Sequence, residues 1–282
     1  MARVLIAGCG YVGSVLAEEL GRDGHEVWGL RRRITALPAG VRPLEADLAL
    51  PATLAGLPPG LDFVFYLAAP GGSDDVLYRT AYVEGLGNLL AALEGEEQRP
   101  RRVVFVSSTA VYAQKDGSWV DEDSPTEPRH FSGQRLLEGE ALLAASSFAH
   151  VVVRFGGIYG PRRGRLIENV RTARARYHAN PPQHTNRIHR DDCAGALRHL
   201  MGVASPEARY LGVDSDPADD ETVLNWLAGT LGAPAPSRAG PEDPRSSRGN
   251  KRCRNARLLE SGYVLRYPTF REGYTAVLSG HG

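Results

Sequence analysis

Arg3-Val4-Leu5-Ile6-Ala7-Gly8-Cys9-Gly10-Tyr11-Val12-Gly13 is the stretch that decides the fold. Its apolar run ends in glycine, which is typical of a buried parallel strand, and the apolar spacing that follows predicts a helix over residues 11–22. A G-x-G-x-x-G sequence between a strand and a helix is typical of a dinucleotide-binding turn. The first glycine permits the turn, the second admits a pyrophosphate, and the third lets the helix pack on the strand. We therefore expect Gly8, Gly10, Tyr11, Val12 and Gly13 to bind a cofactor, the alternative being a glycine-rich turn without a ligand.

The same alternation of strands and helices continues to about residue 160. Apolar and β-branched runs predict strands at 25–30, 41–45, 61–68, 101–107 and 150–155, and helical spacing predicts helices at 74–94 and 131–146. This order predicts an α/β fold, a Rossmann-like doubly wound parallel sheet. We expect a dinucleotide-binding domain over 1–160 and a smaller substrate-binding region over 161–282, partly interleaved with the core, with a long loop at 232–250.

Composition excludes several classes of protein. The 282 residues carry 33 basic and 33 acidic side chains, which argues against a nucleic-acid binder and a polybasic membrane anchor. No apolar run is long enough to span a bilayer. Cys9, Cys193 and Cys253 form neither a disulfide framework nor a metal-ligand pattern, so we expect no metal and a reducing cytoplasm. Lys115 and Lys251 are the only lysines.

The end of the second predicted strand indicates which dinucleotide is bound. An acid here would accept hydrogen bonds from the ribose 2′-hydroxyl of NAD, but the sequence has Arg31, Arg32 and Arg33. Guanidinium groups bind a 2′-phosphate through paired hydrogen bonds. We therefore expect NADP in preference to NAD, held by Arg31 and Arg32; the alternative is a solvated basic loop.

Several further motifs occur in a characteristic order. They are Asp47-Leu48, Leu67-Ala68-Ala69, Ser107 to Tyr112, Arg154 to Pro161 and His189 to Asp192. In this order the chain resembles the extended short-chain dehydrogenase/reductases, which include the NAD-dependent epimerase/dehydratases. The stretches Phe131 to Glu140 and Asn186 to His189 resemble their atypical YeeZ-like branch. The resemblance implies that Asp47 and Leu48 lie beside the adenine, that Ala68 and Ala69 lie beside the cofactor ribose, and that Ser108 binds the substrate oxygen.

The resemblance also implies a Tyr-x-x-x-Lys pair, in which tyrosine transfers a proton and lysine binds the nicotinamide ribose and lowers the tyrosine pKa. In this chain Phe131 fills the tyrosine slot and Arg135 the lysine slot. Phenylalanine has no proton to donate, and arginine keeps the charge without exchanging protons. We therefore take Ser108, Tyr112 and Arg135 as the candidate catalytic residues. His130 becomes a further proton carrier if the helix begins after it.

Candidate substrate residues follow the sixth strand. Tyr159 lies where ligand crevices open in such sheets, and Arg162 begins a basic cluster that would hold an anionic group. His189 is a pocket candidate by resemblance, whereas Asp191 is better explained as a helix N-cap. A second basic cluster comprises Arg245, Arg248, Lys251 and Arg252.

Two functions remain open. The first is an NADP-dependent oxidoreductase or epimerase/dehydratase-type protein that acts on a small hydroxyl- or carbonyl-bearing substrate, such as an anionic nucleotide sugar. The second is a non-catalytic NADP-binding redox sensor or scaffold. A homodimer is expected from the resemblance alone, and no nucleic-acid or membrane partner is expected.

Overall fold

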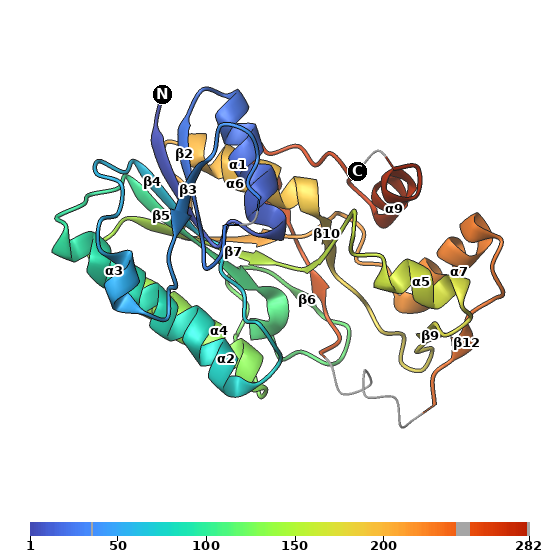
Figure 1. Ribbon diagram of the computed structural model, residues 1–282. Coiled ribbons are helices and arrows are strands. Elements are labelled where there is room, and N and C mark those ends of the chain that lie inside the picture. Colours follow the sequence, from blue (N-terminus) through green and yellow to red (C-terminus); the bar gives the residue numbers. More distant parts are fainter. Residues whose placement is uncertain (35, 241–248, 281–282) are drawn as a thin grey trace. The chain divides into compact units, whose positions relative to one another are not determined.

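The computed structural model describes residues 1–34, 36–240 and 249–280, and its central element is a seven-stranded sheet (Figure 1). Its order is β3-β2-β1-β4-β5-β7-β11, and the pairs from β3 to β5 are parallel. The strands are β1 (Arg3–Ala7), β2 (Glu26–Arg31), β3 (Arg42–Glu45), β4 (Phe63–Tyr66), β5 (Arg102–Ser108), β7 (His150–Phe155) and β11 (Arg209–Gly212). The order reverses between β1 and β4, as in a doubly wound sheet.

Helices cover both faces of this sheet, α1 and α6 on one and α2, α3 and α4 on the other (Figure 1). Val12, Leu16 and Leu20 are buried along one side of α1, as the apolar spacing predicts. The bounds are α1 (Tyr11–Arg22), α2 (Asp75–Arg79), α3 (Gly85–Gly95), α4 (Phe131–Ala144) and α6 (Arg190–Gly202), with 3-10 turns η1 (Pro51–Leu54) and η3 (Thr109–Val111).

The helix predicted over 74–94 is not uniform. A π-helical segment, η2 (Thr80–Glu84), separates α2 from α3. Here the buried Tyr66 hydroxyl donates a 2.5 Å hydrogen bond to the carbonyl of Ala81. A side chain that bonds into the helix ladder favours such a local change of pitch, and sequence periodicity does not report it.

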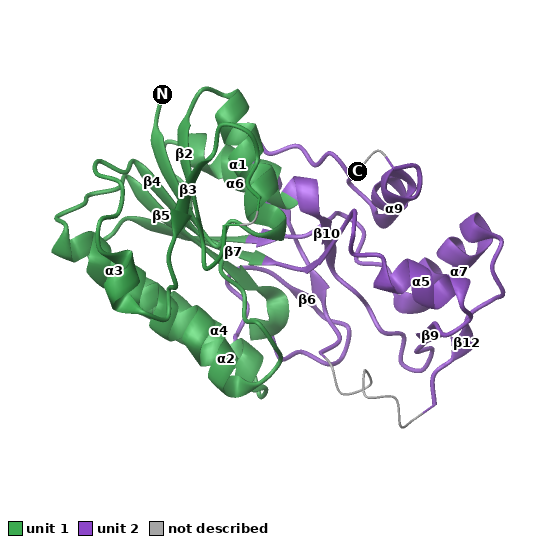
Figure 2. Cartoon of the chain, in the orientation of Figure 1, with its two compact units in different colours: residues 1–111, 127–154, 193–210 green, residues 112–126, 155–192, 211–282 purple. Residues whose placement is uncertain are grey.

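The chain forms two compact units that alternate along the sequence (Figure 2). Unit 1 comprises residues 1–111, 127–154 and 193–210, and unit 2 comprises residues 112–126, 155–192 and 211–282. Residue 160, the predicted boundary, falls within unit 2. Among the described residues, no helix combines the length and apolar character needed to cross a lipid bilayer.

Unit 2 is built from short parallel ladders and helices around its own apolar cluster. Ile167, Val170, Leu224, Leu227 and Phe270 belong to that cluster. The ladders are β8 (Gly157–Tyr159) with β10 (Arg187–His189), β9 (Arg176–Tyr177) with β12 (Ser237–Arg238), and β6 (Trp119–Val120) with β13 (Arg252–Cys253). The helices are α5 (Arg165–Arg171), α7 (Asp220–Leu231), α8 (Ala256–Glu260) and α9 (Phe270–Leu278). Of the loop predicted at 232–250, residues 237–238 form β12, and 241–248 lie outside the described residues.

The close contact at Gly8 gives a test of the fold. Gly8 has a φ of +93°, and a Cβ there would lie 2.4 Å from the backbone nitrogen of Ala68. We expect Gly8→Ala to lower the free energy of unfolding by more than the roughly 1–3 kcal/mol that left-handed strain alone costs. Urea denaturation measures the change.

Gly21→Ala is the matched control. Gly21 lies inside α1, and a Cβ there meets nothing within 4 Å. Alanine should therefore stabilise the helix by about 0.5–1 kcal/mol. Equal effects of the two substitutions would contradict this account of the turn.

Candidate functional site

The strand register of unit 1 brings three predicted cofactor segments to one edge of the sheet. Ala7, the last residue of β1, is paired with Leu30 of β2 and with Tyr66 of β4. The glycine turn, the arginine segment and the Leu67-Ala68-Ala69 segment follow these three residues directly. They therefore leave the carboxyl ends of adjacent strands, where parallel sheets bind ligands.

The glycine turn has the geometry needed by a phosphate-binding loop. A Cβ on Gly13 would lie 2.8 Å from the Gly8 carbonyl oxygen and 3.1 Å from Ile6 Cγ2, so only glycine lets α1 pack this closely. A Cβ on Gly10 would meet nothing closer than 3.8 Å. No side chain caps the N-terminus of α1, and its first turn has no acidic residue. The backbone N–H groups and the helix dipole at this end favour an anion, so the turn fits a pyrophosphate.

The arginines at the end of β2 are arranged differently from each other. Arg31 pairs with Glu45 in strand register and donates a 2.8 Å hydrogen bond to the carbonyl of Ala36. Arg32 is exposed, and its Nη2 lies 4.0 Å from where a Cβ of Gly71 would stand. Arg32 therefore reaches toward the loop that follows β4, along the edge where the glycine turn lies.

The residues expected beside the adenine and ribose lie along the same edge of unit 1. Asp47 and Leu48 follow β3, and the Asp47 carboxylate accepts the backbone N–H of Ala49 at 3.0 Å. Ala68 is half-buried against Gly8, and Ala69 is exposed. Their contacts with a cofactor stay predictions.

The hydroxyl groups of Ser108 and Tyr112 are in different settings. Ser108 ends β5, is half-buried, and its Oγ accepts the backbone N–H of Ala110 at 3.2 Å. The Ser108 hydroxyl thus keeps a proton to donate. Tyr112 belongs to unit 2 and is buried, and its hydroxyl donates a 2.7 Å hydrogen bond to the carbonyl of Asp121.

Phe131 begins α4 and lies among aromatic rings of unit 1. The Tyr78 ring meets it edge to face at a centroid distance of 5.3 Å, and the His130 ring lies 4.1 Å from it. The helix thus starts directly after His130, which is its N-cap: Nδ1 accepts the backbone N–H of Ser132 at 3.3 Å. Neutral His130 therefore carries its proton on Nε2, beside the slot that lacks a phenol.

Arg135 is held by carboxylates. Its Nε and Nη2 donate to the two carboxylate oxygens of Asp75 at 2.7 and 2.8 Å, and Nη1 donates to Glu138 at 2.5 Å. Hydrogen bonding to Arg135 holds the pKa of Asp75 below its usual range. The positive charge in the lysine slot, which would lower the pKa of a tyrosine at position 131, is therefore balanced by these carboxylates. Arg135 also links α4 to α2.

A buried ion pair fixes α4 against the sheet. Arg154 of β7 donates to both oxygens of Glu140, at 3.0 and 2.6 Å, and Ser107 donates to Glu140 Oε1 at 2.6 Å. All three side chains are buried. The role of Glu140 was not predicted from the sequence, although a charge at Arg154 within an apolar strand indicates a buried partner.

Within unit 2 the structure brings together two of the three predicted substrate residues. Tyr159 and His189 are register partners of the β8–β10 ladder, and their ring centroids lie 5.3 Å apart. Both are buried, whereas Arg162 is exposed and has a φ of +65°. Of the second basic cluster, Arg245 and Arg248 lie outside the described residues. Substrate binding by Tyr159, Arg162 and His189 stays a prediction.

The expected N-cap at Asp191 is wrong. Helix α6 begins at Arg190, and His189 Nδ1 accepts the backbone N–H of Asp191 at 3.2 Å, which is the capping bond. Asp192 instead accepts the Tyr263 hydroxyl and the backbone N–H groups of Arg266 and Tyr267 at 2.7–2.9 Å. The acidic pair was a valid helix-start signal, but the helix begins earlier than it implied.

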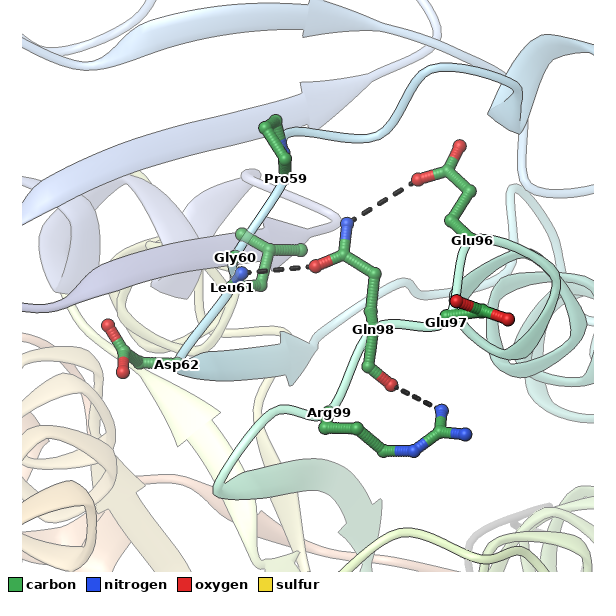
Figure 3. A pocket seen from close by; sticks show the side chains of 8 residues that line it. All are labelled: Pro59, Gly60, Leu61, Asp62, Glu96, Glu97, Gln98 and Arg99. Atoms are coloured by element: carbon green, nitrogen blue, oxygen red, sulfur yellow. Dashed lines mark hydrogen bonds between the residues drawn. The ribbon is translucent and has the colours of Figure 1, made fainter.

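A pocket lies at the amino ends of the strands of the unit 1 sheet, opposite the predicted cofactor segments (Figure 3). It is lined by residues 59–62, which precede β4, and 96–99, which follow α3. The buried Gln98 side chain accepts the backbone N–H of Leu61 at 3.1 Å and donates to Glu96 at 3.4 Å. None of the predicted site residues lies in this pocket. Over the described ranges, no cluster of three or more His, Cys, Asp or Glu residues could hold a metal ion.

Comparison with known proteins identifies the family. The model of the NAD dependent epimerase/dehydratase family matches residues 4–189. The chain belongs to this family. A 3-diazoavenalumate denitrifying reductase from a Streptomyces species is 30% identical over 261 residues, 83% of each chain. A UDP-glucose 4-epimerase from Streptomyces lividans is 26% identical over 246 residues, 79% of this chain and 74% of the relative.

Solved structures of the epimerase/dehydratase type share the fold. A protein of this type from Methylobacillus flagellatus is 43% identical, with a TM-score of 0.83 over 99% of this chain and 98% of the other. The human epimerase family protein SDR39U1, solved with NADPH, is 22% identical, with a TM-score of 0.81 over 98% and 99% of the two chains. The predicted family and doubly wound α/β fold are confirmed, while membership of the YeeZ-like branch stays a prediction.

The Glu140–Arg154 pair gives a prediction about stability. Glu140→Ala leaves the buried Arg154 without its carboxylate, which should lower the free energy of unfolding by about 3–5 kcal/mol. Urea denaturation measures this loss. Glu138→Ala on the same helix removes a carboxylate that is 40% exposed, so it should cost less than about 1 kcal/mol. Similar losses in the two variants would contradict the assignment.

Proposed function

We propose that the chain is an NADP(H)-dependent oxidoreductase of the epimerase/dehydratase family, acting on a small hydroxyl- or carbonyl-bearing substrate. The observation that carries this proposal is the edge of unit 1 where a glycine turn and two arginines leave adjacent strands. A reductase and an epimerase among its relatives support redox chemistry with a nicotinamide cofactor. The epimerase makes a nucleotide sugar one substrate to test.

Different residues of the chain bind different parts of the cofactor. The N-terminus of α1 and the glycine turn take the pyrophosphate, and Arg31 and Arg32 take the 2′-phosphate. The adenine is bound beside Asp47 and Leu48, and the cofactor ribose beside Ala68 and Ala69. NADP(H) supplies or accepts a hydride when bound. The protein must then position the substrate and move a proton.

His130 is our proposed proton carrier in place of a tyrosine. Its ring lies against Phe131, its side chain is exposed, and its Nδ1 bonds Ser132, so Nε2 is the ring nitrogen left for a substrate. Proton release from Nε2 requires a proton on Nδ1 as well, and Ser132 Oγ, 2.9 Å from Nδ1, can accept that hydrogen bond. Tyr112 has its hydroxyl bonded to a carbonyl inside unit 2. Arg135 has no exchangeable proton near neutrality. Ser108 binds the substrate oxygen through its hydroxyl.

A non-catalytic NADP sensor is the second candidate. The observation that favours it is the pairing of Arg135 with Asp75 and Glu138, which removes a free cation from the lysine slot. Restoring the pair with Phe131→Tyr and Arg135→Lys separates the two functions. A large gain in turnover indicates an otherwise competent enzyme, whereas tight NADP binding without turnover favours the sensor.

Cofactor choice gives the first test. We expect Arg32→Ser to weaken NADP binding roughly 10- to 100-fold, because a hydrogen-bonded contact to a charged group contributes about 1.5–3 kcal/mol. NAD binding should be unchanged, since NAD lacks the 2′-phosphate. Isothermal titration of both dinucleotides measures this. Arg33→Ser, an exposed neighbour, is the control, and tighter binding of NAD than NADP by the wild type would refute the NADP assignment.

The role of His130 gives the second test. His130→Asn places an amide oxygen where Nδ1 caps the helix, so the fold is kept while Nε2 is lost. We expect NADPH oxidation with a panel of carbonyl compounds and nucleotide sugars to fall roughly 10²- to 10⁴-fold in kcat, the range for removal of general acid catalysis. NADPH oxidation is followed by absorbance as a function of pH.

Two results would argue against this role. One is a His130→Asn variant that keeps the pH profile and kcat of the wild type. The other is a loss of kcat that is matched by loss of thermal stability, which would mean that the cap was not preserved. Turnover that survives Ser108→Ala would separately remove Ser108 from the site.

A further inference from the structure

One face of the β8–β10 ladder in unit 2 carries a row of buried polar side chains. Tyr159 and His189 are register partners, and Arg187 lies two residues before His189, hence on the same face. Asp214 donates its backbone N–H to the carbonyl of Arg187 at 2.6 Å, which places it beside the row. These four residues are between 0% and 7% exposed.

Three polar atoms of the row have no hydrogen-bond partner within the described part of the chain. They are Tyr159 Oη, His189 Nε2 and Asp214 Oδ2. His189 Nδ1 accepts the N–H of Asp191, so Nε2 of the neutral ring is a donor. Buried polar groups are nearly always paired, and three orphans in one row therefore indicate a group that they bind.

Arg187 adds a buried positive charge without a close counter-ion. Its guanidinium donates to the carbonyl and the hydroxyl of Thr185, bonds Tyr274, and lies 5.7 Å from the Phe270 ring. Among residues 1–34, 36–240 and 249–280, no carboxylate lies within ion-pair distance of it. A buried cation in such a setting favours an incoming anion.

Asp214 is a buried carboxyl that interacts electrostatically with this charge. Burial raises the pKa of Asp214 to about 7, the attraction of Arg187 opposes the shift, and the carboxylates of Asp216 and Asp192 add to it. The hydroxyls of Tyr159 and Tyr274 also face it. Burial lowers the pKa of His189, so that ring stays neutral at the pH where Asp214 titrates. Near neutrality Asp214 therefore balances Arg187 only in part.

Helix α9 and the turn before it cover the row. The Tyr274 ring lies 4.5 Å from Tyr159, and the Tyr267 ring lies 4.2 Å from His189. A Cβ on Gly273 would stand 1.8 Å from Tyr159 Oη, so the glycine is what allows α9 to lie directly on this hydroxyl. A ligand reaches the row only when α9 moves.

We propose that this row is a closed binding site for an oxyanion, a carboxylate or phosphate group of the substrate. Arg187 supplies the counter-charge, Tyr159 Oη and His189 Nε2 donate hydrogen bonds, and Asp214 takes up one proton as the anion enters and then donates it in a third hydrogen bond. The site rests on the proposed function only in assigning the oxyanion to the substrate.

Calorimetric titration of the full chain tests the site with sulfate and acetate as probes. Neither probe titrates appreciably between pH 6.5 and 8.5, so any linked proton belongs to the protein. We expect the Kd to rise about tenfold per pH unit above pH 7 and to level off below it, with uptake of close to one proton at pH 8. Preference for sulfate indicates a phosphate ligand, and preference for acetate indicates a carboxylate.

Three variants make the test specific. Asp214→Asn mimics the neutral acid, so binding should persist and lose its pH dependence. Tyr159→Phe should weaken binding several-fold, and Arg187→Gln should abolish it. Arg174→Gln, an exposed arginine of unit 2, should change nothing.

The pH dependence of thermal stability gives a second test of the role of Asp214. Its pKa is raised in the folded state, so ionisation opposes folding as the pH rises from about 4 toward 8. The thermal midpoint of Asp214→Asn should therefore exceed that of the wild type at pH 8 and equal it at pH 4. Failure of this pattern contradicts a buried acid at this position.

Two outcomes overturn the site. One is no binding of either probe at pH 6.5; the other is binding that Asp214→Asn, Tyr159→Phe and Arg187→Gln all leave unchanged, which means an adventitious ion only. NADP titration of the same variants separates this from the proposed function. Intact NADP binding with no oxyanion site removes the inference alone.

Discussion

The contact between Gly8 and the backbone of Leu67 and Ala68 is the constraint on which the ligand-binding edge of unit 1 depends. A side chain on Gly8 would overlap Ala68, and its φ of +93° already excludes most residues. This contact lets the turn after β1 lie on the segment after β4. The same glycine carbonyl meets Gly13, so one turn fixes both the neighbouring strand end and the approach of α1. The glycine spacing in the sequence is a direct consequence of these two contacts.

Phe131 and Arg135 form a consistent pair of replacements. The ring of Phe131 packs against Tyr78 of α2, and the guanidinium of Arg135 meets both oxygens of Asp75 at the start of the same helix. A lysine could not make this paired contact, because its ammonium is a single point of charge. Two positions that served proton transfer in the resembled family therefore hold α4 to α2 here. This explains arginine at 135 more specifically than the scarcity of lysine does.

The core of the fold could be predicted because buried parallel strands leave continuous apolar runs. Residues 3–7 and 11–22 have the predicted structure without a shift. The π segment at 80–84 could not be predicted, since it depends on the hydroxyl of Tyr66 from another element. No local pattern encodes the pairing of Glu140 with Arg154, the capping by His189 or the buried surroundings of Asp214, because each depends on contacts with other elements. Position 131 was informative in the sequence because it breaks a known motif.

Buried charge is paired at Glu140 in unit 1 and is left without an ion pair beside Asp214 in unit 2, and this difference distinguishes a scaffold contact from the proposed site. In unit 1, Glu140 accepts hydrogen bonds from both Arg154 and Ser107, so its charge is compensated. In unit 2, Arg187 and Asp214 are neighbours through the backbone but do not form an ion pair. A paired group gains nothing from a ligand, because its hydrogen bonds are already made. An unpaired one gains both charge compensation and hydrogen bonds, so the free energy available for binding an anion is concentrated in the row beside Asp214.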